Sequence, residues 1–400
     1  MTTLLAYMSR LSLSSRTLVN FAFTLLLLAV VAIPVSLTVP IKNSDFPVYY
    51  QNAQLIRAGK GPEIWRHDLV SISSGPGLNE PPLVMWALAP VAWLPFPAAK
   101  FVFDCTMAVL IAISALVLAR TARLSQRGTL LLLGLMAASG PIFEILKVSK
   151  PSPLLFCGVA FCLACLQKGE ETKAGAWIAL CMVKPQEVLP FLAFMAGGMR
   201  KRFLLGLAAA GLVLVALAFL VFGVEGFTNY LNRLAYIEGH PYFVMTDNQS
   251  ILTGQLLRLG VPPATAMRLG NTVYGLGLLG LFIFGLMTRT SAQWWIKGTV
   301  VAFVSMACFF PYMFAYDLVI VIPGICFLIQ MLAKQRGKLL LGGALLSVGT
   351  YLNPIYIFIH YYLPFRIDLH FCALVVCSLV SIAAVAQFDD RMSALPETRA

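Results

Sequence analysis

The sequence predicts an all-α polytopic membrane protein, and three observations lead to this fold class. Of its 400 residues, 59% are hydrophobic and only 12% are charged, whereas soluble domains carry about 45–50% apolar and about 25% charged residues. The mean hydropathy is +0.83. Apolar runs of about 20 residues recur along the chain, and this is the length that a helix needs to cross the hydrocarbon core of a bilayer.

These runs predict about twelve transmembrane or half-membrane helices, with both termini in the cytoplasm. The first run is long for the apolar region of a signal peptide and is interpreted as an uncleaved span. Short basic segments between the runs set the orientation by the positive-inside rule. The spans are predicted at 18–37, 98–119, 129–146, 153–167, 203–222, 271–288, 296–311, 317–333, 339–358 and 369–387.

A broken pair of helices is predicted between the fourth and fifth of these spans, at 174–183 and 186–198. Lys184 and Pro185 interrupt the apolar stretch there, and proline disfavours helix at the residue before it. Each half is too short to cross the bilayer alone. We therefore expect two half-depth helices that meet at Lys184, beside protein or a wet cavity.

Two long extracytoplasmic loops are predicted, at approximately 38–97 and 223–270. Residues 1–388 would form a single integral-membrane domain, and residues 389–400 a short polar cytoplasmic tail. This layout predicts a multi-pass protein of the inner (plasma) membrane. Long loops favour binding or catalysis over simple anchoring, so an active site is expected on the extracytoplasmic side.

The net charge of +12 does not indicate a nucleic-acid partner, because the basic residues fall in short clusters between apolar runs. No histidine or carboxylate cluster in the sequence has the spacing of a metal site. A G-x-G-x-x-G pattern at Gly275, Gly277 and Gly280 lies inside an apolar run and is interpreted as helix packing instead of nucleotide binding.

Asp45 is the candidate catalytic residue, because it emerges directly after the first span. Tyr49, Ala53 and Ile56 follow with the spacing of an amphipathic helix, which Gly59 would end. Asp45 would then cap this helix or act as a general base at the membrane surface. The sequence leaves both interpretations open.

Four more ionisable residues are candidates for binding a substrate. Lys184 is an ionisable group at membrane depth, which is functional by default, although it could instead extend toward the surface. Lys150 lies in a tight turn and would contact lipid phosphate or only solvent. Glu80 precedes two prolines and would bind a sugar hydroxyl or mark a stiff turn. Asp317 would hold a sugar, orient a lysine or begin a helix.

The predicted second loop and the segment before Asp317 supply further candidates. Asn248 and Gln249 precede an apolar stretch and are assigned to substrate binding, although Asn248 could cap a helix. Arg233 is one of several cations that could neutralise a phosphate. Tyr312 and Tyr49 lie close in sequence to Asp317 and Asp45 and are assigned to substrate binding.

The order of these motifs resembles glycosyltransferase family 87. The motifs are Asp-Phe-x-Val-Tyr-Tyr at 45–50, Pro-Pro-Leu at 81–83, Lys-Pro at 184–185, Asn-Gln-Ser at 248–250 and Pro-Tyr…Tyr-Asp at 311–317. The resemblance implies a GT-C-type fold and an Asp45 general base. It also implies inverting transfer of a hexose, mannose above all, from a polyprenyl-phosphate donor to a glycolipid or glycan acceptor, with neither a cofactor nor a metal.

Two other functions fit part of this pattern. Broken helices and a buried lysine are also typical of a transporter or lipid flippase of envelope biogenesis, although such folds usually carry repeats that this sequence does not show. A structural subunit of an envelope complex would have no chemical use for Asp45 or Lys184.

Overall fold

The computed structural model describes residues 44–65, 81, 82, 85, 89–137, 139–239, 251–310, 313, 315–334 and 369–387. These residues are helical or connect helices, and no β-strand occurs among them. The all-α prediction is therefore confirmed for this part of the chain. The predicted spans 18–37 and 339–358 and the predicted tail lie outside the described residues.

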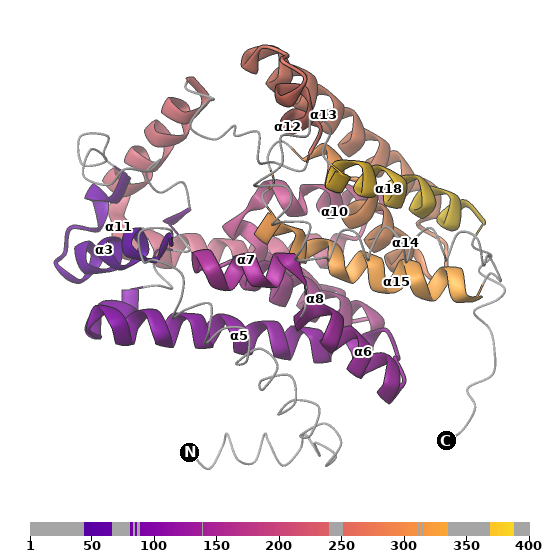
Figure 1. Cartoon of the computed structure of the whole chain (residues 1–400), viewed down its shortest axis with the longest axis horizontal. Coiled ribbons are helices and arrows are strands. Elements are labelled where there is room, and N and C mark those ends of the chain that lie inside the picture. The colour runs from indigo at the N-terminus through magenta and orange to yellow at the C-terminus, as the bar shows by residue number, and fades with distance from the viewer. Residues whose placement is uncertain are drawn as a thin grey trace.

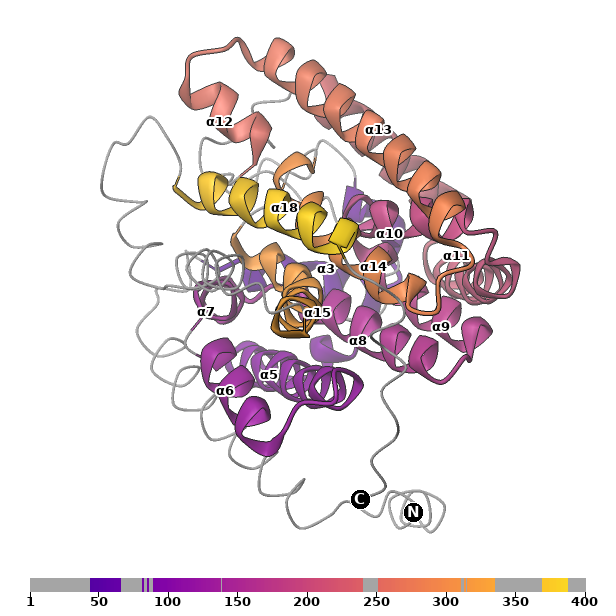
Figure 2. The same ribbon diagram turned by 90° about the vertical axis from the view of Figure 1, so that its right-hand side faces the viewer.

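Three of the described helices are long and apolar enough to cross a membrane. They are α5 (Phe96–Thr121), the Lys201–Ala235 part of α11 (Lys201–Gly239) and α13 (Pro263–Thr288). Both α11 and α13 leave large apolar side chains exposed, including Leu212, Leu220 and Leu276, as is typical of helices that face lipid. Figure 2 shows α13 along the outer edge of the bundle.

The predicted span at 129–146 contains a break that its hydropathy does not reveal. It consists of α6 (Gln126–Ala137) and α7 (Gly140–Val148), which are bent by 49°. Ser139 caps α7, because its Oγ accepts a hydrogen bond from the Ile142 amide at 3.4 Å. Pro141 follows in the first turn, where a missing amide proton costs nothing. Together these residues start a new helix inside the apolar run.

The predicted break at Lys184 is confirmed. After α8 (Pro153–Gln167), the chain forms α9 (Glu171–Ile178) and a 3₁₀ turn, η5 (Ala179–Val183). Lys184 leaves the helical region with φ −140° and ψ 78°, and Pro185 begins α10 (Pro185–Gly197). The proline thus acts as the sequence pattern predicts.

Helix α11 continues beyond the predicted end of its span. Gly223 adopts φ 61° and ψ −173°, a conformation open to glycine but not to other residues, and the helix resumes on its far side. Figure 1 shows the second part of α11 turning away from the first. Much of the predicted loop at 223–270 is therefore helical, including α12 (Leu252–Arg258) and the first turns of α13.

The C-terminal third is built from short helical pieces that pack on one another. α14 (Trp294–Val300) passes into a π-helical turn, η7 (Val301–Ser305), and a 3₁₀ turn, η8 (Ala307–Phe309). Another 3₁₀ segment, η9 (Ala315–Ile320), leads into α15 (Val321–Lys334). α18 (Leu369–Gln387) packs on this region, and its Ser378 Oγ lies 3.1 Å from the Ser305 carbonyl oxygen. The Ser378 hydroxyl thus donates a hydrogen bond to the irregular backbone of the π-helical turn.

A smaller module lies at the other side of the bundle. It contains the predicted amphipathic helix, α3 (Phe46–Arg57), and two 3₁₀ turns, η2 (Gly61–Trp65) and η4 (Ala89–Trp93). Its aromatic core includes Phe46 and Tyr49, whereas α8, α10 and α15 share the main core. Figure 1 shows α7 and α8 between α3 on the left and α15 on the right.

Glycine residues allow the central helices to approach one another closely. A side chain at Gly285 of α13 would overlap the Phe194 carbonyl of α10, and one at Gly197 of α10 would overlap the Phe282 carbonyl of α13. Small residues are the usual means of tight helix packing in membranes. Gly275 and Gly280, by contrast, face open space, so the close approach does not use the two outer glycines of the G-x-G-x-x-G pattern.

We expect Gly285→Ala to destabilise the fold by about 1–3 kcal/mol, because the new methyl group must push α10 and α13 apart. Gly280→Ala, on the same helix, is the matched control and is expected to be neutral or slightly stabilising. Thermal unfolding in detergent would compare the two. Equal melting temperatures would show that this helix crossing tolerates a side chain.

Candidate active site

Asp45 begins α3, but its carboxylate does not cap the helix. The neighbouring Ser44 Oγ accepts the Phe46 amide at 3.2 Å, and the Asp45 amide donates to the Val148 carbonyl at 2.9 Å. These bonds fix the start of α3 against the end of α7. The Asp45 side chain is 47% exposed, and its Oδ2 lies 2.5 Å from Lys150 Nζ. The carboxylate is therefore both accessible and paired with a cation.

The turn between α7 and α8 presents Lys150 to Asp45. Ser149 adopts a left-handed conformation with φ 57° at the end of α7, which reverses the chain. Lys150 follows with a side chain only 12% exposed. Lys147, the other lysine of this turn, lies 3.1 Å from Glu144 on its own helix. Of the two lysines, it is Lys150 that reaches Asp45.

The break before α10 supplies the second lysine of the site. Lys184 Nζ forms an ion pair with Asp317 Oδ1 and lies 3.7 Å from Glu187 Oε1. Both carboxylates are fully buried. The Tyr274 hydroxyl of α13 donates to the Gln186 carbonyl at 2.5 Å and so holds the break in place. Lys184 therefore points into the protein and does not extend to the surface.

Asp317 connects the break to the α7–α8 turn. It lies in the first turn of η9, and its Oδ1 accepts a hydrogen bond from Ser152 Oγ at 2.9 Å. Because Ser152 is two residues after Lys150, the turn between α7 and α8 contacts the carboxylates of both Asp45 and Asp317. Five charged residues from four segments are thus brought together, and we call them the lysine–carboxylate cluster: Asp45, Lys150, Lys184, Glu187 and Asp317.

Two tyrosine rings flank the lysines of the lysine–carboxylate cluster. Lys150 Nζ lies 5.0 Å from the centroid of the Tyr316 ring and 5.9 Å from that of Tyr49. Lys184 Nζ lies 4.9 Å from the same Tyr316 ring. Tyr49 is buried in the aromatic core of the α3 module. The structure thus places it beneath Lys150 and not at an open surface.

The structure brings together four of the sequence candidates besides Tyr49: Asp45, Lys150, Lys184 and Asp317. Arg233 lies buried on the second part of α11. Four other candidates lie outside the described residues: Glu80, Asn248, Gln249 and Tyr312. Sequence reasoning missed Glu187, although an ionisable residue in an apolar run is the same signal that identified Lys184. It also missed Ser152, for which the sequence carries no distinct signal, and it assigned no role to Tyr316, although this tyrosine belongs to the Pro-Tyr…Tyr-Asp motif.

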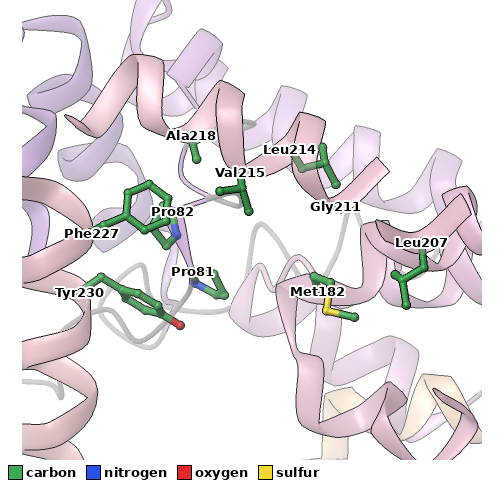
Figure 3. A pocket seen from close by; sticks show the side chains of 10 residues that line it. All are labelled: Pro81, Pro82, Met182, Leu207, Gly211, Leu214, Val215, Ala218, Phe227 and Tyr230. Atoms are coloured by element: carbon green, nitrogen blue, oxygen red, sulfur yellow. The ribbon is translucent and has the colours of Figure 1, made fainter. Parts of the chain in front are cut away.

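An apolar cavity of about 390 Å³ lies in the bend of α11. Gly211, Leu214 and Val215 line it from the first part of the helix, and Phe227 and Tyr230 from the second. Figure 3 shows these two walls, with Met182 opposite and the prolines of the Pro-Pro-Leu motif between them. Met182 is two residues before Lys184, so the cavity and the lysine–carboxylate cluster share the 182–184 segment.

This arrangement is suited to acid–base chemistry beside an anion. An accessible carboxylate can take a proton, and two mostly buried ammonium groups can stabilise negative charge in surroundings of low dielectric constant. Among the described residues, no group of three or more His, Cys, Asp or Glu side chains has the geometry of a metal site.

The model of glycosyltransferase family 87 matches residues 80–314 of the chain. That range includes Lys150 and Lys184, whereas Asp45 lies before it and Asp317 lies three residues after its end. No curated protein and no solved structure matches the chain.

We expect Lys184→Met to destabilise the protein by about 3–5 kcal/mol, because it leaves the buried carboxylates of Asp317 and Glu187 without their cation. Adding Asp317→Asn should restore the part of this loss that comes from Asp317, since the amide oxygen can still accept from Ser152. Thermal unfolding of the wild type, the single variant and the double variant measures both effects. A single variant as stable as the wild type would contradict the pairing.

Proposed function

Because the chain belongs to glycosyltransferase family 87, we propose that it moves a hexose from a polyprenyl-phosphate donor to a glycolipid or glycan acceptor. Mannose is the first choice of sugar, and transfer would take place on the extracytoplasmic side of the plasma membrane. The single observation that carries this proposal is the half-exposed Asp45 carboxylate beside Lys150, which lies near the same Tyr316 ring as Lys184.

Asp45 acts as the general base in this proposal. Its carboxylate takes the proton of an acceptor hydroxyl while the hydroxyl oxygen attacks the anomeric carbon of the donor sugar. The bond between that carbon and the phosphate oxygen breaks, and its electron pair leaves with polyprenyl phosphate. Attack from the opposite face inverts the anomeric configuration. The exposed fraction of Asp45 supports this role, because a base must reach the proton that it removes.

Lys184 and Lys150 stabilise the departing phosphate. Negative charge grows on the phosphate oxygens as the glycosidic bond breaks, and cations already fixed in a site of low dielectric constant stabilise that charge most strongly. Both lysine side chains are 12% exposed, so neither is fully solvated. Arg233 is a further candidate, because it lies three residues after Tyr230 and hence on the cavity side of α11.

The apolar cavity is suited to the polyprenyl chain of the donor. Its lining is almost entirely hydrocarbon, and one of its lining residues, Met182, lies two residues before Lys184 of the lysine–carboxylate cluster. An amphiphile with a phosphate head and an isoprenoid tail would fill both parts of such a site. Roles in binding the sugar or the acceptor stay predictions for Glu80, Asn248, Gln249, Tyr312 and Asp317.

Asp45→Asn is expected to lower transfer by about 10²–10⁴-fold, because the amide cannot accept the proton. The assay incubates purified protein with radiolabelled polyprenyl-phosphate hexose and a membrane-lipid acceptor and measures labelled product. Asp104→Asn is the matched control, since Asp104 pairs with Lys100 within α5, outside the proposed site. Full activity of Asp45→Asn would refute the assigned base. Movement of the donor across the bilayer without transfer would identify a transporter instead.

Gly211→Trp is expected to raise the KM for a long-chain polyprenyl donor about tenfold, because the indole would occupy space in the cavity. A donor shortened to two isoprene units should be affected much less. Gly275→Trp is the matched control, since both glycines have open space around an added side chain and Gly275 faces outward on α13. Equal effects on the long and short donors would argue against a tail site in this cavity.

A further inference from the structure

One aromatic ring contacts both lysines of the lysine–carboxylate cluster. The ammonium groups of Lys150 and Lys184 lie 5.0 and 4.9 Å from the centroid of the Tyr316 ring. Because both distances are measured to the same point, the two ammonium groups are at most about 10 Å apart. The Tyr316 ring therefore contacts both cations of the lysine–carboxylate cluster.

The contacts around Tyr316 form a continuous chain. Asp45 pairs with Lys150, Lys150 lies over the ring, the ring lies beside Lys184, and Lys184 pairs with Asp317. Two like charges this close repel each other. The face of an aromatic ring attracts a cation, and most strongly where water is largely excluded. The ring thus favours an arrangement in which both cations stay near the centre of the cluster.

We infer that Tyr316 is a positioning residue that holds Lys150 and Lys184 as a pair for one phosphate group. Lysine has a long and flexible stem, so an unsupported pair would lose conformational entropy on binding an anion. Ordering the stems in advance reduces that loss. The inference deepens the proposed function, which supplies the phosphate as that of a polyprenyl donor. The inference assigns the ordering of the two lysines to the ring face of Tyr316 and not to its phenolic hydroxyl.

Binding of farnesyl phosphate to the full-length protein in nanodiscs tests this role directly. We expect Tyr316→Leu to weaken binding about tenfold, because it removes both ring contacts, whereas Tyr316→Phe should stay within about twofold of the wild type because the ring remains. Farnesol, which lacks the phosphate, should bind equally to all three proteins. Trp93→Leu is the matched control, since Arg57 lies 4.7 Å from that exposed ring, outside the cluster.

Three results would overturn the inference. Tyr316→Leu could bind farnesyl phosphate as well as the wild type does. Tyr316→Phe could lose as much affinity as Tyr316→Leu, which would assign the effect to the hydroxyl. Tyr316→Leu could lose farnesol binding equally, which would indicate a general packing defect.

The transfer assay separates this inference from the proposed function. A wild type that transfers hexose while Tyr316→Leu keeps the wild-type KM for the donor would refute only the positioning role. A wild type that binds farnesyl phosphate through Tyr316 but transfers no sugar would refute only the proposed reaction.

Discussion

The site depends on one physical constraint, which is that a charge removed from water needs an opposite charge beside it. Lys184, Glu187 and Asp317 are largely or fully buried in a protein made mostly of apolar helices. The residues that satisfy this constraint come from the break before α10 and from η9, which are more than a hundred residues apart. Pairing the charges therefore also connects the break before α10, η9 and the turn between α7 and α8.

The same pairing shapes the chemistry of the site. Asp45 is the most exposed carboxylate of the lysine–carboxylate cluster, and its partner Lys150 is nearly covered. In the proposed reaction the exposed base, Asp45, takes the proton of the acceptor. The more buried cations, Lys150 and Lys184, lie where negative charge would grow on the phosphate of the donor. Family membership gives the class of reaction, and the arrangement of charges gives a physical reason for each proposed role.

Part of this architecture could be predicted from the sequence alone. Hydropathy and the Lys184–Pro185 pair predicted α5, α8 and the broken helix, because these features depend on local composition and local stereochemistry. The break at Ser139 was not predicted, because it lies inside an apolar run. The continuation of α11 past Gly223 was not predicted either, because the predicted loop begins at that glycine. Ordered motifs predicted Asp45 and Lys184 as site residues, and the structure places both in the lysine–carboxylate cluster. The ring contacts of Tyr316 were not predictable, because they depend on where side chains from separate segments point.

The bend at Gly223 also affects how a lipid would arrive. A straight α11 would present one continuous apolar surface to the bilayer, whereas the bent helix turns part of that surface inward and encloses a hollow. That hollow belongs to the same helix whose outer side chains are exposed where lipid would lie. A hydrophobic molecule diffusing in the plane of the membrane would therefore meet this hollow on the same helix, and Met182 in its lining lies two residues from Lys184.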